Sequence, residues 1–225
     1  MNIYRDVELF WKQQAALYGS TFHIDFSEKV QSPPGRPDVF SLASVERDIH
    51  TCTACSLSSA RQGIVTGFGN PQARVICISS EPPAGPFVLE VEQDALFCKI
   101  LSAIGFDRNE VYLISALKCR PNAGQIPEES AFQACSDHLF AQIRAIGPKL
   151  MLVLGEKAVQ ILSGRPDQLE SFRGKEHHFA GISAFATYHP AQLLVNTSLK
   201  HGAWNDVQLL RRKYDELVGD KPSLA

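Results

Sequence analysis

Hydrophobic residues recur at helical spacing near the start of the chain. Val7, Phe10, Trp11 and Tyr18 would share one face of a helix, which predicts an amphipathic helix in the first two dozen residues. The stretch 31–37 has three prolines within five residues, which excludes a helix or a central strand and indicates an extended linker. We therefore expect residues 1–40 to form a helical appendage with a proline-rich linker, and residues 41–225 to form the main domain.

From residue 41 onward, short apolar runs alternate with helical patterns. Ser41 is expected to cap a helix that extends through Ile49. Strands are expected at 74–79, 111–115 and 149–154, with one or two more in 179–187, and helices at 94–104, 128–146, 157–162 and 200–217. Alternating strands and helices predict an α/β fold, a three-layer α/β/α arrangement with a mostly parallel central sheet.

In such sheets, ligands bind at the carboxyl ends of the strands. This rule directs attention to the segments that follow the predicted strands, which are 79–87, 115–121, 155–156 and 188–196. We expect the chemistry of the protein to lie there.

The composition is that of an ordinary globular protein: 225 residues, of which 44% are hydrophobic and 20% charged. No apolar run approaches the roughly 20 residues of a membrane helix, and the first residues lack the apolar stretch of a signal peptide, so we expect a cytoplasmic protein without membrane contact. The formal charge of −2 gives no global attraction to nucleic acid, so DNA binding would need a local basic patch.

The six cysteines separate into two groups by their spacing. Cys52 and Cys55 would lie on one tight turn, and Cys119 and Cys135 follow far along the chain. Four soft thiolate ligands suit zinc or an iron–sulfur cluster. A zinc ribbon usually has two close pairs, so the wide second pair favours a cluster, although a redox couple or a chance pair is the alternative. The other two cysteines, Cys77 and Cys98, are expected to be apolar core residues.

Several separate blocks of the sequence carry a recognisable pattern. They are 52–69 with Arg61, the strand that ends at Glu81, 105–112, 118–121 with Cys119, Cys135, 154–158, 173–174 and 187–194. In this order, the blocks resemble the iron–sulfur uracil-DNA glycosylases, the family-four type of their superfamily. The resemblance covers about two-thirds of the chain and excludes residues 1–40. The resemblance implies a 4Fe–4S cluster on Cys52, Cys55, Cys119 and Cys135, the superfamily's three-layer fold, and a DNA-facing cleft at the carboxyl edge of the sheet.

The resemblance also implies roles for single residues. His189, in a Tyr-His-Pro segment, would donate a hydrogen bond to a carbonyl oxygen of a base that has swung out of the duplex, and Glu81 would be the second catalytic residue. Leu193 and Leu194 would be an apolar wedge in the duplex, or they would begin the packing of the last helix. Basic candidates for phosphate contact are Lys118, Arg120 and Arg173, together with Arg61, Lys175 and Lys200. We expect a monomer.

Three departures from the family pattern concern the base pocket. The glycines of the family's first motif are replaced in Ser80-Glu81-Pro82-Pro83-Ala84, and the following loop is shortened before Phe87, the expected stacking residue. Ser115 stands where the family has an asparagine that pairs with uracil, beside Glu81 and Phe87 as the base-binding set. We therefore expect a DNA glycosylase for uracil or another damaged base, with an inactive iron–sulfur nucleic-acid-binding protein as the alternative.

Overall fold

The computed structural model describes residues 41–83, 88–122, 124–166 and 168–222. At its centre lies a six-stranded sheet in the order β1-β3-β2-β4-β6-β5. The strands are β1 (Phe68–Gly69), β2 (Val75–Ser79), β3 (Val111–Ser115), β4 (Leu150–Leu154), β5 (His177–Phe179) and β6 (Ile182–Thr187). The inner four run parallel, and β1 and β5 pair antiparallel at the two edges.

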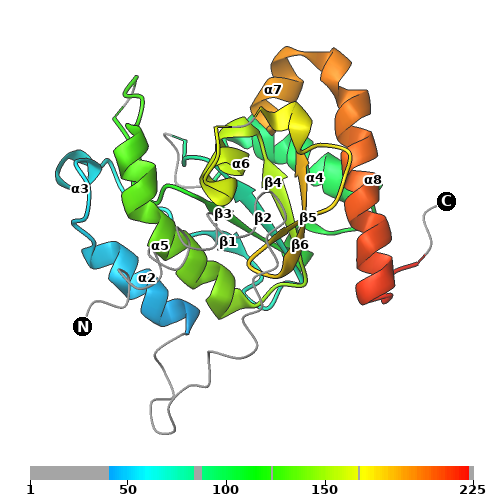
Figure 1. Cartoon of the computed structure of the whole chain (residues 1–225), viewed down its shortest axis with the longest axis horizontal. Coiled ribbons are helices and arrows are strands. Elements are labelled where there is room, and N and C mark those ends of the chain that lie inside the picture. The colour runs from blue at the N-terminus through cyan, green and yellow to red at the C-terminus, as the bar shows by residue number, and fades with distance from the viewer. Residues whose placement is uncertain (1–40, 84–87, 123, 167, 223–225) are drawn as a thin grey trace, which may run out of the picture.

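Helices cover both faces of this sheet (Figure 1). The helices in chain order are α2 (Leu42–Thr51), α3 (Leu57–Ala60), α4 (Val91–Ala103), α5 (Glu129–Ile146), α6 (Glu156–Ser163), α7 (Pro190–Val195) and α8 (Lys200–Leu217). Short 3₁₀ turns lie at Arg108–Glu110, Leu169–Ser171 and Thr197–Leu199.

Alternation along the strands divides the core into two layers, because successive side chains of a strand point to opposite faces. Cys77 of β2 packs with Phe97 of α4 and Leu210 of α8 in one cluster. Its neighbour Ile78 packs in the other cluster, with Leu139 of α5 and residues of α6. The predicted three-layer α/β/α fold is thus confirmed.

Local signals explain most element boundaries. The side-chain oxygen of Ser41 accepts a hydrogen bond from the Ser44 amide at 3.2 Å, so the predicted cap of α2 is present. Helix α4 begins three residues earlier than the predicted Asp94, because Glu90 and Gln93 form a reciprocal cap. Two strands lie near 179–187, joined by a turn in which Ala180 and Gly181 both have positive φ, as a tight hairpin requires.

The expected appendage at 1–40 and the expected stacking residue Phe87 lie outside the described residues. Within the described part of the chain, no helix is long and apolar enough to cross a membrane.

Candidate functional site

All four predicted cysteine ligands line one cavity. Cys52 and Cys55 lie between α2 and α3, Cys119 lies beyond β3, and Cys135 lies on α5. Backbone pairing brings these segments together: the Arg120 amide donates to the Gly63 carbonyl at 2.9 Å, and 62–65 runs beside 118–120. Ile49, Ala54, Ser58, Lys118, Ala134 and His138 complete the lining.

Two hydrogen-bond donors point at sulfur atoms of this cavity. The Arg61 guanidinium lies 3.6 Å from Cys119 Sγ and also donates to the Cys52 carbonyl at 3.0 Å. The Lys118 amide donates to Cys135 Sγ at 3.3 Å. Burial raises the pKa of the Cys135 thiol to about 11, against the lowering effect of the Lys118 cation. Donors of this kind suit sulfur atoms that carry negative charge when they bind a metal.

The described residues contain no group of three or more histidine, cysteine, aspartate or glutamate side chains placed to hold a single metal ion. Neither Cys77 nor Cys98 lines the cavity. Cys77 is fully buried in the core, as predicted, but Cys98 is only partly buried and its thiol donates to the Asp94 carboxylate at 3.8 Å, so the prediction of a core residue is wrong for Cys98.

His189 lies at the carboxyl edge of the sheet, where it follows β6 and caps α7. Its Nδ1 accepts a hydrogen bond from the Ala191 amide at 3.2 Å, so Nδ1 carries no proton. In the neutral ring the proton is then on Nε2, which lies 3.1 Å from the Ser79 hydroxyl. Burial lowers the pKa of His189 to about 4, which keeps the ring neutral at pH 7. The side chain is therefore a neutral donor at its Nε2.

Gly155 allows the end of β4 to lie close to His189. A Cβ added at Gly155 would lie 3.1 Å from the Cβ of His189, and its φ of +86° favours glycine. The Gly155 amide donates to the Thr187 carbonyl at 2.8 Å. The ends of β2, β4 and β6 thus meet at His189 through Ser79, Gly155 and Thr187.

Ser115 ends β3 directly beside Ser79 of β2. It is fully buried, and its hydroxyl donates to the Leu117 carbonyl at 2.6 Å. Glu81, two residues beyond β2, is exposed. The carboxyl edge therefore brings Ser79, Ser115 and His189 together, with Glu81 at its rim, and Ser79 is the member that sequence reasoning missed. The sequence feature that points to Ser79 is its position as the last residue of a predicted strand.

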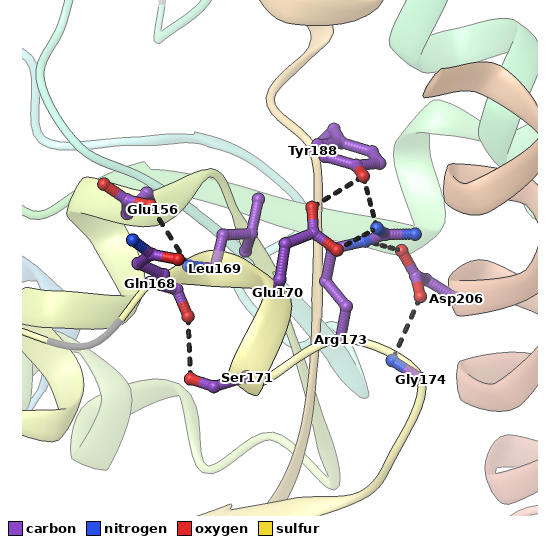
Figure 2. A network of polar contacts seen from close by, with 9 residues as sticks. All are labelled: Glu156, Gln168, Leu169, Glu170, Ser171, Arg173, Gly174, Tyr188 and Asp206. Carbon is purple, nitrogen blue, oxygen red and sulfur yellow. Dashed lines mark hydrogen bonds and ion pairs between the residues drawn. The ribbon is translucent and has the colours of Figure 1, made fainter. Parts of the chain in front are cut away.

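Two predicted phosphate contacts are corrected by the structure. Lys118 is 1% exposed, and its ammonium donates to the Ser115 carbonyl inside the protein. Arg173 has a side chain that is 11% exposed, and it pairs with Asp206 and Glu170 (Figure 2). A phosphate cannot reach the buried ammonium of Lys118. The charge of Arg173 is already neutralised by the two carboxylates that it pairs with. Arg120 remains partly exposed at the cysteine segment, while Lys175 and Lys200 are exposed.

The predicted wedge is also corrected in part. Leu193 is 1% exposed and packs inside the protein, whereas Leu194 is 42% and Val195 90% exposed. Successive residues of a helix are rotated by about 100°, so neighbours on a short helix rarely share a face. Leu193 therefore packs in the interior instead of forming part of a wedge, and Leu194 projects outward from α7.

Comparison with known proteins gives this arrangement a class. The family model of the uracil DNA glycosylase superfamily matches residues 66–208, well over half of the chain, and the chain belongs to that superfamily. The resemblance drawn from the sequence motifs is thereby confirmed.

Individual relatives narrow the comparison. The chain is similar to the type-4 uracil-DNA glycosylase of Archaeoglobus fulgidus, at 29% identity over 195 residues that cover 80% of this chain and 95% of the relative. It is 32% identical to the type-4 enzyme of Thermotoga maritima over 164 residues, 68% of this chain and 83% of the relative. A type-5 uracil-DNA glycosylase of Pyrobaculum aerophilum matches 39% of each chain at 33% identity.

Proposed function

We propose that this protein is a DNA glycosylase that hydrolyses the N-glycosidic bond of uracil or another damaged base. The observation that carries the proposal is the neutral imidazole of His189, with its proton on Nε2, at the strand ends of a superfamily member. Donors held in a partly buried site stabilise developing negative charge more than water does.

The chemistry needs such a donor. When the bond between the base and C1′ of the sugar breaks, its electron pair goes to the base, and the sugar becomes an oxocarbenium-like cation. A water oxygen then bonds to C1′, and the water releases a proton to the base or to solvent. His189 Nε2–H would exchange its bond to Ser79 for one to a base carbonyl oxygen. The carboxylate of Glu81, at the rim, would stabilise the cation and orient the water.

Base choice rests on Ser115. Its hydroxyl already donates to the Leu117 carbonyl, so it does not offer the fixed donor and acceptor pair of an amide. The loss of one partner in a buried hydrogen-bonded pair costs about 1–3 kcal/mol, which weakens base selection by roughly fivefold to a hundredfold. Uracil and other deaminated bases are therefore all candidate substrates.

We further propose that Cys52, Cys55, Cys119 and Cys135 hold a 4Fe–4S cluster. The shared cavity and the donors on the sulfurs of Cys119 and Cys135 support this assignment. When bound, the cluster supplies a cross-link between the segment after α2, the segment after β3, and α5. Metal binding of this kind contributes directly to folding free energy.

The DNA contacts proposed here are fewer than the sequence predicted. Leu194 would enter the duplex at the site of the flipped base, and Arg120 would contact phosphate. A monomeric and cytoplasmic protein, with residues 41–225 as the glycosylase domain, stays our prediction.

A second candidate is a binding protein that does not cut the bond. The buried hydroxyl of Ser115, and the prolines Pro82 and Pro83 in place of amide donors after β2, favour it.

Single-turnover base release separates the two functions. Oligonucleotides with uracil, hypoxanthine, xanthine or an undamaged base are compared for the wild type, for His189→Ala and for His178→Ala. His178, an exposed residue of the edge strand β5 that pairs with Ser183 near the start of β6, is the matched control. The enzyme predicts release from at least one damaged base, a loss of about 10²–10³-fold in H189A, and no change in H178A. Absence of release from every substrate, with salt-dependent DNA binding retained, would establish the binding protein.

A further inference from the structure

Arg173 lies at the centre of a network that reaches the residue before His189 (Figure 2). Its Nε donates to Asp206 Oδ2 at 2.7 Å, and its Nη1 donates to Glu170 Oε2 at 2.9 Å and to the Tyr188 hydroxyl. The guanidinium carbon lies 3.8 Å from the centre of the Tyr188 ring. We call Glu170, Arg173, Tyr188 and Asp206 the Arg173 network.

Tyr188 is held on two sides by this network. Arg173 stacks on the face of the Tyr188 ring, and the Tyr188 hydroxyl donates a hydrogen bond to Glu170 Oε1 at 2.7 Å. The flat guanidinium suits both contacts at once, which a lysine ammonium cannot do. The side chain of Tyr188 therefore has little freedom to turn.

The network also holds the backbone around Tyr188. Arg173 forms a parallel bridge with Ala186 of β6, two residues before Tyr188. Asp206 of α8 accepts a hydrogen bond from the Gly174 amide at 3.2 Å, so α8 and the segment after Ser171 are tied together. A side chain at Gly202 would collide with the Arg173 guanidinium, so this glycine gives α8 room for the network.

Only Tyr188 and His189 connect the end of β6 to the start of α7. His189 is extended and caps α7, so the direction of its ring follows from where the chain leaves β6. A displacement of about 1 Å at a reacting group can cost on the order of 10²-fold in rate. Fixing Tyr188 is thus a direct way to fix the imidazole.

We propose that Arg173 is a positioning residue for His189, acting through the ring and hydroxyl of Tyr188, and that it does not contact DNA. This inference rests on the proposed function for its effect on rate. The orientation of His189 can be measured without any activity.

The first test compares Arg173→Lys with Arg211→Lys in single-turnover release. Arg211 is a matched control because it is also a buried arginine of this domain, paired with Asp215 and far from His189 in its contacts. R173K should lower the release rate at saturating protein about tenfold or more, with the DNA Kd within about twofold. R211K should lower thermal stability without changing that rate constant for folded protein.

A double-mutant cycle separates positioning from folding. If Arg173 acts through His189, R173K changes the rate by less than about twofold in an H189A background. An equal fall in both backgrounds would mean that Arg173 only supports the fold. A weaker DNA Kd whose salt slope drops by about one would mean a phosphate contact. Either outcome overturns the proposal.

The second test is nitrogen NMR of the imidazoles, in which the H189A spectrum identifies the His189 signals among seven histidines. The wild type should show the neutral form with its proton on Nε2, R211K should show the same, and R173K should show a mixture of tautomers. An R173K spectrum identical to the wild type overturns the proposal. If the wild type releases no base, the proposed function fails while this measurement still decides the role of Arg173.

Discussion

The cysteine cavity and the carboxyl edge of the sheet are held together in different ways. Around the cysteines, Cys52 and Cys55 lie on a turn between α2 and the four-residue α3, and Arg61 ties that turn to Cys119. At the carboxyl edge, both ring nitrogens of His189 are engaged by the protein, and the Arg173 network fixes the preceding residue. In our proposal the first region is completed by a bound cluster, whereas the second is organised by contacts within the protein alone.

The largest expected effect therefore lies at the cysteines. Cys135→Ser should abolish iron binding, because one thiolate of four is lost from a buried wall of the cavity. A loss of several kcal/mol would lower Tm by on the order of 10 °C in a chain of this size. Iron and acid-labile sulfide analysis after anaerobic purification, with thermal unfolding, measures both.

Cys98→Ser is the matched control, since Cys98 lies outside the cavity. It should keep its iron and the wild-type Tm. Wild-type iron content in C135S would contradict the assigned ligand set and, with it, the contrast between the two regions.

The next effect concerns the pH dependence of stability at His189. Its folded pKa of about 4 lies below the unfolded value near 6.5, so the unfolded chain takes up the proton first as the pH falls. The contribution of His189 is complete above pH 6.5 and declines through the window from about 6.5 to 4. Between pH 7.5 and 5 the wild type should lose on the order of 1–2 kcal/mol more than His189→Asn, which does not titrate.

Denaturant unfolding at the two pH values measures this difference, and the subtraction removes the titration of the other histidines. Identical pH dependence in H189N and the wild type would show that the ring is not held neutral in the folded state.

The smallest effect is expected at Leu194, and its buried neighbour Leu193 serves as the comparison. Leu194→Ala should slow base release from duplex DNA by roughly fivefold, with less effect on single strands, because an apolar wedge assists base extrusion. Leu193→Ala should instead cost about 2–5 kcal/mol of stability through an internal cavity. Release rates on duplex and single-stranded DNA test L194A, and urea unfolding tests L193A. Equal slowing of L194A on the two substrates would exclude the wedge.

Much of this molecule followed from local pattern. The four inner strands and the long helices were predicted because burial imposes periods of about 2 and 3.6 residues on the sequence, whereas the two-residue edge strand β1 is too short to show such a period. The cysteines were predicted because a close pair of cysteines, with two more far along the chain, favours metal ligation, and all four line one cavity.

The roles of charged residues could not be predicted in the same way. From its sequence context Arg173 is a candidate for phosphate contact. In the structure it pairs with Asp206 of α8, more than thirty residues later in the chain, and this pairing neutralises its charge. Lys118 is buried in the lining of the same cavity as Cys119 and Cys135. Whether a cation faces solvent depends on tertiary neighbours, which spacing along the chain does not encode. An acidic residue among the apolar positions of α8, such as Asp206 between Ala203 and Leu210, was the available signal.

The two outer strands of the sheet have a bearing on how the protein behaves at high concentration. β1 has only two residues and β5 three, and each is antiparallel to its inner neighbour. Long unpaired edges are templates for strand addition between molecules, which leads to aggregation. Such short edges present few free amides and carbonyls, so the sheet ends offer little to a second copy, and concentrated samples are expected to resist fibril growth from this part of the fold.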